Sequence, residues 1–385
     1  MAAYTAPARL VVFVGSYTKP MGHCPSACGV GVTAYSCDEA TGALAPLGPP
    51  AALENPSFLC LGPPRPGSSE RVLYAACEYA EGDGRIAALR VSPDGRFAAT
   101  VPLSDVCAGG GAPCNLALGG EVLLCANYCG GTIGAWAVGA DGSIGERIAW
   151  RDHNDQAARP ADALGPRGAR QEAAHPHCVC PAGAGHVLVA DLGYDAVVAL
   201  GSGFNGASAP LCARDARPLA LPPGAGPRHV ALHPSGARAF VIHELGCAIS
   251  AHDFDPLSAE LSPSRCTVAT LPRGVDADAC ANTCAEVRCS RDGRFVYGSN
   301  RGHDSIATFA FDEPTAALQP LAHTSSGGRT PRAFALSPSE RLMLVANQDS
   351  SSVVAFSRDA ASGVLTPTGV VNQIGSPVFL LFAEL

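Results

Sequence analysis

The chain repeats one short pattern seven times, and this repeat restricts the fold more than any other feature of the sequence. Each copy opens with a short apolar strand, usually at a proline, and passes through a turn into a second apolar strand. The opening strands begin at Pro56, Pro113, Pro176, Pro227, Cys284, Pro331 and Pro377. Proline at the first position of a strand removes no ladder hydrogen bond. Short strands that recur at a period of roughly 50 residues are typical of the blades of a β-propeller.

The two ends of the chain complete each other within this pattern. A third short run, such as Ala248-Ile-Ser-Ala-His, and then an outer strand follow each opening hairpin. The N-terminal segment supplies three strands of a blade, and Pro377-Val-Phe-Leu-Leu supplies the inner strand that this blade lacks. A shared blade closes the ring and leaves no free sheet edge. We therefore predict an all-β fold, a single seven-bladed β-propeller over residues 1–385 with four antiparallel strands per blade.

One interval between repeats is longer than the others because of an insertion at residues 152–172, rich in Arg, Ala, Asp and Gly. The insertion lies shortly before the inner strand that opens at Pro176. A segment in that place emerges at the end of the ring where the inner strands begin. We interpret it as a loop over the mouth of the propeller rather than as a linker between domains.

Composition narrows the class of partner. The formal net charge of −8 argues against nucleic acid. No apolar run approaches the roughly 20 residues that span a membrane, and the N-terminal segment lacks the features of a signal peptide. Many of the seventeen cysteines lie in apolar strand patterns, so we interpret them as buried, reduced thiols. We expect a cytoplasmic protein, monomeric or weakly homo-oligomeric, with no membrane or nucleic-acid partner, no metal and no cofactor.

Charged and polar residues recur where inner strands begin and where second strands end. These two positions lie at the same edge of an antiparallel hairpin. In the hairpin that opens at Pro227, they hold Arg228 and His229 on one strand, and His243 and Glu244 on the other, so we expect all four to sit together. The full set expected around one mouth of the ring is His175, His177, Asp191, Arg228, His229, Glu244, Asn300, Arg301, Arg332 and Asn347.

These residue types suit an acid–base site that binds an anion. Arg228, Arg301 and Arg332 carry planar guanidinium groups that match a carboxylate or a phosphate. A histidine and a glutamate at close quarters can share proton transfer near neutral pH. The alternatives are structural: asparagines that cap turns, histidines satisfied within strands, and a buried ion-pair network that holds blades together. The fold alone does not decide between these functions.

At these residues the sequence resembles the seven-bladed propeller lactonase family, which contains bacterial 6-phosphogluconolactonase and the fungal carboxymuconate cyclase. The matching stretches fall in order along nearly the whole chain: Val14-Gly-Ser-Tyr-Thr, Asn55-Pro-Ser-Phe-Leu, Ala126-Asn-Tyr, Pro176-His, Asp191-Leu-Gly-Tyr-Asp, Gly226-Pro-Arg-His, His243-Glu-Leu, Ser299-Asn-Arg-Gly, Thr330-Pro-Arg and Ala346-Asn-Gln. Two features depart from the family pattern. They are the insertion and Ala174-His-Pro-His, where the family tends to show Pro-His-x-His.

The resemblance implies a lactone-related activity at the predicted mouth. The family's active-site histidine resembles His177, with His175 as its close neighbour. Its two arginines resemble Arg228 and Arg301, and its carboxylate resembles Glu244. The leading hypothesis is therefore a lactonase, a carboxylic-ester hydrolase that acts on 6-phosphogluconolactone or a related anionic sugar lactone of the pentose phosphate pathway type.

In this hypothesis His177, Glu244, Arg228 and Arg301 are catalytic. The expected substrate-binding residues are His175, His229, Asp191, Asn300, Arg332 and Asn347. Three other hypotheses stay open: a cycloisomerase that acts on a carboxylated muconate, a metal-dependent lactonase, and a non-catalytic binding propeller. The metal-dependent lactonase would use oxygen ligands suited to Ca²⁺, from Glu78, Asn127, Asp191, Glu244, Asn300 and Asn347.

Overall fold

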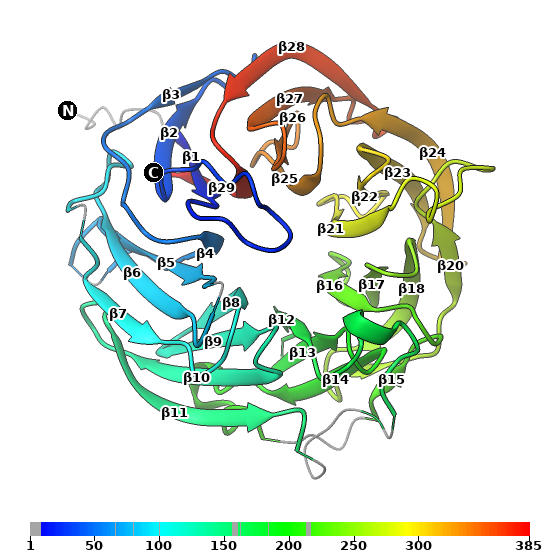
Figure 1. The fold of residues 1–385 in the computed structure, drawn as a ribbon, viewed down its shortest axis with the longest axis horizontal. Coiled ribbons are helices and arrows are strands. Elements are labelled where there is room, and N and C mark those ends of the chain that lie inside the picture. Colours follow the sequence, from blue (N-terminus) through cyan, green and yellow to red (C-terminus); the bar gives the residue numbers. More distant parts are fainter. Residues whose placement is uncertain are drawn as a thin grey trace, which may run out of the picture.

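Seven antiparallel sheets are arranged around a common centre, as the ribbon in Figure 1 shows. The computed structural model describes residues 9–65, 67–79, 81–99, 101–155, 161, 163–183, 185–212 and 217–385. The prediction of a seven-bladed propeller is confirmed. One blade differs in detail, because its third strand pairs with two short outer strands instead of one.

Each blade contains an inner, a second, a third and an outer strand. The inner strands are β29 (Pro377–Glu384), β4 (Pro56–Leu61), β8 (Pro113–Gly119), β12 (Pro176–Pro181), β16 (Pro227–Leu232), β21 (Thr283–Cys289) and β25 (Pro331–Leu336). The second strands are β1 (Leu10–Ser16), β5 (Arg71–Cys77), β9 (Val122–Asn127), β13 (His186–Asp191), β17 (Arg238–His243), β22 (Phe295–Arg301) and β26 (Leu342–Asn347).

The third strands are β2 (Val32–Cys37), β6 (Arg85–Val91), β10 (Thr132–Val138), β14 (Ala196–Gly201), β18 (Ala248–Asp255), β23 (Ser305–Asp312) and β27 (Ser352–Arg358). The outer strands are β3 (Leu44–Pro46), β7 (Ser104–Cys107), β11 (Ile144–Asp152), β15 (Leu219–Ala220), β19 (Glu260–Leu261), β20 (Cys266–Ala269), β24 (Ala317–Ser325) and β28 (Leu365–Gln373). Within the described part of the chain, two short 3-10 helices, η1 (Gly168–Arg170) and η2 (Phe204–Gly206), lie in connecting loops.

The ring closes within one blade that both ends of the chain share. β29 pairs antiparallel with β1, with Val12 opposite Phe382 and Val14 opposite Leu380. Figure 1 shows β29 and β1 side by side in the inner part of the ring. This is the closure that the sequence predicts from its incomplete terminal repeats. It covers the edge that β1 would otherwise expose.

The hydrophobic core lies between neighbouring blades. Phe240 and Ile242 on β17, for example, pack in one buried cluster with Val287 on β21 and Val296 on β22 of the next blade. A second strand is therefore covered on both faces, and all six residues of β26 are buried. This double burial explains why the second strands read as continuous apolar runs instead of alternating patterns.

A β-bulge recurs near the start of the inner strands and positions the site. In β16, Pro227 pairs with His243 and His229 pairs with Ile242, so Arg228 has no partner residue in β17. The same irregularity leaves out Ser57, Cys114, His177 and Arg332 at the second positions of β4, β8, β12 and β25. A bulge re-aims the side chain of the extra residue. Ser57, Cys114, Arg228 and Arg332 indeed line the narrow interior of the channel.

Candidate active site

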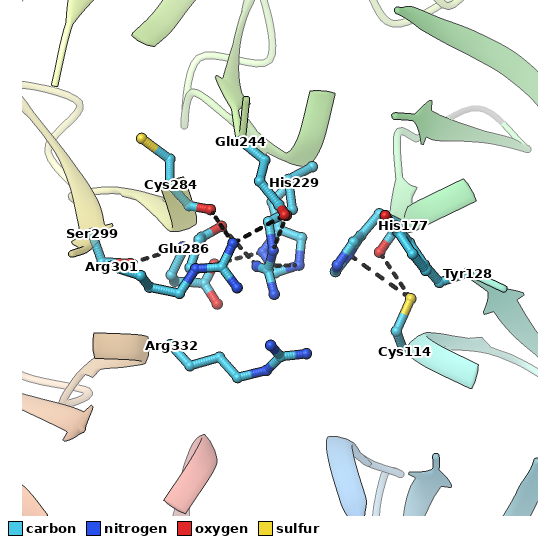
Figure 2. Close-up of polar contacts among 12 residues, drawn as sticks. Cys114, Tyr128, His177, His229, Glu244, Cys284, Glu286, Ser299, Arg301 and Arg332 are labelled. Carbon is cyan, nitrogen blue, oxygen red and sulfur yellow. Dashed lines mark hydrogen bonds and ion pairs between the residues drawn. The ribbon is translucent and has the colours of Figure 1, made fainter. Parts of the chain in front are cut away.

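A cavity of about 640 Å³ lies where the inner strands begin. Four residues of the predicted set line it: His177, Glu244, Arg301 and Arg332. Arg228 lies next to this cavity, in the narrow interior of the channel, and contacts Glu244 from there. Figure 2 shows His177, Glu244, Arg301 and Arg332 converging from different blades. The fold therefore gathers residues that are far apart in the sequence at one mouth.

Glu244 is the centre of an arginine cluster. Its Oε1 atom is 2.5 Å from Nη2 of Arg170 and 3.2 Å from Nη2 of Arg301, and its Oε2 atom is 3.1 Å from Nε of Arg228. Burial by itself raises the pKa of Glu244, but Arg301, Arg170 and Arg228 outweigh it and hold that pKa well below its usual value. Glu244 is therefore ionised and engaged on both oxygens.

Arg228 connects this cluster to a second buried carboxylate. Its Nη1 atom donates to the carbonyl oxygen of Ala285 at 2.7 Å and to Nε2 of His229 at 3.2 Å. Because a guanidinium only donates, Nε2 of His229 accepts, and Nδ1 carries the proton that it donates to Oε1 of Glu286 at 3.1 Å. Burial lowers the pKa of His229 to about 4, although Glu286 opposes the shift. His229 is thus a neutral residue of the inner channel, away from the main cavity.

His177 presents its imidazole to the cavity in the neutral form. Burial, and then the nearby charge of Arg228, lower its pKa well below the usual value. The ring packs edge-on against Tyr128 and His229, and its Nδ1 atom is 3.8 Å from Sγ of Cys114. Within the described part of the chain no hydrogen bond joins His177 to Glu244, so Glu244 does not orient this ring directly.

His175 and Asp191 lie behind the cavity wall and do not line it. The His175 ring stacks on Tyr128 with centroids 4.3 Å apart, and its Nδ1 atom is 2.9 Å from the carbonyl oxygen of the same tyrosine. Asp191 accepts hydrogen bonds from the backbone N–H groups of His175 and Gly193, and its Oδ2 atom is 2.8 Å from Nδ1 of His153. These contacts fix the wall that carries His177 and Tyr128.

Asn300 and Asn347 form links within their blades and do not line the cavity either. Nδ2 of Asn300 donates to the carbonyl oxygen of Thr270 at 2.8 Å and to Oγ of Ser305 at 3.2 Å. Nδ2 of Asn347 donates to the carbonyl oxygen of Ser326 at 3.0 Å. Asn127 makes the equivalent contact with Ala108. The structure therefore places these asparagines in the turn-capping role that was the alternative interpretation.

His243 departs from the expectation that all four ionisable residues of its hairpin sit together. Its Nε2 atom is 2.8 Å from Oγ of Ser250 on β18, inside the blade. Successive residues of an extended chain point to opposite sides. Glu244 faces the cavity, so His243, the residue before it, faces the interior of the sheet. The prediction was wrong for this side chain.

The predicted insertion supplies a cavity residue that the sequence did not identify. Arg170, at the end of η1, lines the cavity, contacts Glu244 and donates to the hydroxyl oxygen of Tyr128 at 3.2 Å. Residues 156–160 and 162 of the insertion lie outside the described residues. Tyr128 and Cys114 also line the cavity and were not predicted. The repeated position after the opening proline is the sequence signal that would have identified Cys114.

The opposite wall of the cavity contains a second buried glutamate. Glu78 follows β5 just as Glu244 follows β17. Tyr17 donates to Oε1 of Glu78 at 3.1 Å, and Nε2 of His23 is 2.9 Å from the hydroxyl oxygen of Tyr17. The nearest arginine nitrogen, Nη2 of Arg332, is 3.7 Å from the same Oε1 atom. Among the described residues, the guanidinium of Arg332 makes no hydrogen bond.

No three His, Cys, Asp or Glu side chains gather in a metal-binding group within the described residues. The amides of Asn127, Asn300 and Asn347 serve the internal contacts given above. No helix among the described residues has the length and apolar character needed to cross a membrane. All seventeen cysteines are free thiols.

Comparisons with known proteins agree with this architecture. The family model described as "Lactonase, 7-bladed beta-propeller" matches residues 11–382. The 6-phosphogluconolactonase of Bacillus subtilis is 27% identical over 377 residues, which cover 97% of this chain and 98% of that protein. The structure of a periplasmic gluconolactonase from Pseudomonas aeruginosa is 28% identical with a TM-score of 0.84, covering 98% of this chain and 100% of the other. The structure of a Lactobacillus plantarum protein is 26% identical with a TM-score of 0.82, and the match covers the same shares of the two chains.

Proposed function

The chain belongs to the seven-bladed β-propeller lactonase family, and from this premise we propose that it hydrolyses an anionic sugar lactone, with 6-phosphogluconolactone as the leading substrate. The observation that carries this proposal is Arg332. Its guanidinium lines the cavity without a hydrogen bond among the described residues and points toward the same space as Arg301 and His177 in Figure 2. A buried planar cation whose one ion pair, with Glu78, is as long as 3.7 Å can still bind a phosphate or carboxylate of the substrate.

In this proposal Glu244 acts as the counter-ion that sets the arginine geometry. It holds Arg170, Arg228 and Arg301 by direct ion pairs, and Arg301 also donates to the carbonyl oxygen of Cys284 at 2.8 Å. Arginines fixed before the substrate arrives can stabilise the negative charge that develops on the lactone carbonyl oxygen. Glu244 then contributes to catalysis through the position and charge of its partners.

His177 contributes a neutral imidazole at the cavity surface. A neutral ring nitrogen can hold the attacking water by a hydrogen bond. The residues behind it, His175, His229 and Asp191, then act as positioning residues, because their side chains contact the wall and not the cavity.

The similar proteins support a lactone substrate and leave its phosphate group to be tested. The Bacillus relative is named a 6-phosphogluconolactonase and the Pseudomonas relative a gluconolactonase, so the two names differ by one phosphate. A cavity of about 640 Å³ falls within the common size range of small-molecule sites and accommodates either lactone.

The decisive experiment measures hydrolysis of freshly prepared 6-phosphogluconolactone and of gluconolactone, each scored against its spontaneous rate. We expect acceleration of both, with the larger kcat/KM for the phosphorylated lactone. A parallel spectrophotometric assay on a carboxylated muconate tests the cycloisomerase. No acceleration of either lactone would overturn the proposal, and turnover of the muconate alone would replace it. Equal rates for the two lactones would reject the phosphate preference only.

We further propose a cytoplasmic location and a role in the pentose phosphate pathway. Seventeen free thiols suit a reducing compartment, whereas the Pseudomonas relative is named periplasmic. Fractionation of cells that express the protein, with a marker for each compartment, tests the location. Recovery with the periplasmic marker would contradict it.

A further inference from the structure

Among the described residues, three carboxylates line the cavity, and they differ in what occupies their oxygens. Glu244 is paired with three arginines through both oxygens. Asp349 is exposed and accepts hydrogen bonds from Thr330 and Gln348 on separate oxygens. Glu78 is 3% exposed, and Tyr17 donates to its Oε1 atom. Among the described residues no group donates a hydrogen bond to Oε2 of Glu78. Glu78 is thus the buried carboxylate with an unoccupied oxygen at the cavity.

Hydrolysis of a lactone needs a group that first accepts a proton and then returns it. Water must lose a proton as its oxygen attacks the carbonyl carbon, and the ring oxygen must gain one as it leaves. Burial disfavours the charged form of any acid or base. If buried His177 accepted the proton, a neutral group would become a cation beside Arg228. If Glu78 accepted it, an anion would become a neutral acid. Glu244 is unsuited because three arginines stabilise its charge.

We propose that Glu78 is the catalytic base of this site, an assignment that rests on the proposed lactonase function. A water molecule gives one proton to Glu78 while its oxygen forms a bond to the lactone carbonyl carbon. The π electron pair moves to the carbonyl oxygen, where Arg301 faces the negative charge. The intermediate then collapses, the bond between carbon and ring oxygen breaks, and Glu78 returns its proton to that oxygen. The product is the open hydroxy acid, and Glu78 is again ionised.

The surroundings of Glu78 define what its carboxylate contacts. Its Oε1 atom accepts a hydrogen bond from Tyr17 and lies 3.7 Å from Nη2 of Arg332. Burial raises the pKa of the nearby thiols of Cys77, Cys114 and Cys129, so they are neutral near pH 7. Among the described residues, Arg332 is therefore the one cation that pairs with this carboxylate.

The first test replaces the carboxylate alone. Glu78→Gln keeps the size of the side chain and leaves an amide oxygen for Tyr17. We expect kcat to fall by at least about 100-fold while KM changes by less than about threefold. Glu54→Gln is the matched control, because Glu54 lies on a nearby loop, pairs with Lys19 and does not line the cavity. It should keep wild-type rates. Wild-type kcat in folded Glu78→Gln would overturn the assignment and leave the lactonase proposal intact.

Chemical rescue separates a base from a merely structural residue. Glu78→Ala should regain at least tenfold activity on addition of formate, a carboxylate small enough for the vacated space. The absence of rescue by formate in folded Glu78→Ala would overturn the role as base. A wild-type protein that hydrolyses no lactone would overturn both proposals.

Discussion

Arg228 and Glu244 belong to the two halves of one hairpin and meet at its open end, with Nε of Arg228 3.1 Å from Oε2 of Glu244. Each side chain is 4% exposed. Arg301 reaches the same carboxylate from the next blade, and Arg170 reaches it from the insertion. One carboxylate therefore ties three separate segments together at the mouth of the channel. This arrangement is both a structural tie between blades and the fixed cationic surface of the proposed site.

Arg332 should decide the preference for a phosphorylated substrate. In Arg332→Met the apolar stem remains and the cation is lost. We expect kcat/KM for 6-phosphogluconolactone to fall roughly 30-fold, equivalent to about 2 kcal/mol of a charged hydrogen bond. Gluconolactone should lose much less, because it has no phosphate. Steady-state kinetics on both lactones measure the ratio, and an equal loss for the two would place the phosphate elsewhere.

Glu244 should contribute strongly to stability as well as to activity. Glu244→Gln leaves the buried guanidinium groups of Arg228 and Arg301 without their carboxylate. Removal of one partner from a buried ion pair typically costs about 3–5 kcal/mol. Urea unfolding should show this loss, while Glu54→Gln, at a partly exposed pair, should unfold close to the wild type. An unchanged midpoint in Glu244→Gln would show that the cluster does not hold the blades together.

The buried histidines should make the protein less stable as the pH falls below about 6.5. Burial lowers the pKa of His229 and of His243 to about 4 in the folded state, compared with 6.5 in the unfolded chain. Between these values the unfolded state binds more protons, so the free energy of unfolding rises with pH. Each histidine contributes up to about 1.4 kcal/mol per pH unit.

Urea titrations at pH 5, 6 and 7.5 measure this slope. His243→Gln should reduce the slope of unfolding free energy against pH by the contribution of one histidine. KM should not change, because His243 lies inside the blade. Glu244 adds a separate effect at lower pH. Its pKa is depressed in the folded state, so its contribution is present above the unfolded value of about 4.3 and is lost as the pH falls below that value. A slope that is the same in wild type and His243→Gln would contradict the assignment.

Asn300 should matter for stability and not for substrate binding. Asn300→Ala leaves the carbonyl oxygen of Thr270 and the amide of Asn282 without their partner. A buried unsatisfied group costs about 1–3 kcal/mol. Asn127→Ala breaks the equivalent link in another blade and serves as the matched comparison. We expect both variants to melt earlier with wild-type KM, whereas a large rise in KM for Asn300→Ala alone would restore its predicted binding role.

Removal of divalent cations should leave the activity unchanged. Arg170, Arg228 and Arg301 surround Glu244 and would repel a dication at this mouth. Dialysis against EDTA, followed by assays with and without added Ca²⁺, measures the effect. A loss that Ca²⁺ restores would favour the metal-dependent lactonase instead.

The amino-acid sequence by itself determined the blades, the closure of the ring and the position of the mouth. Six of the seven inner strands open at the predicted residue, such as Pro227 or Pro331, and β21 begins one residue before the predicted Cys284. β29 completes the blade of β1. It also predicted the contact between Arg228 and Glu244. Apart from the closure, which pairs the last strand with the first, these features follow from pairing between strands that are neighbours in the sequence. A local pattern of apolar residues and turns is sufficient to specify them.

Only the tertiary structure decided which side chains reach the cavity. The bulges turn His177, Arg228 and Arg332 inward, whereas strand alternation turns His243 into its blade. The contact of Tyr17 with Glu78 joins residues that are 61 positions apart, and Arg170 reaches Glu244 across 74 positions. Side-chain direction at a bulge and contacts between blades depend on packing over these separations. No local pattern encodes that packing. The sequence therefore predicted the position of the mouth, and the folded ring determined which side chains line it.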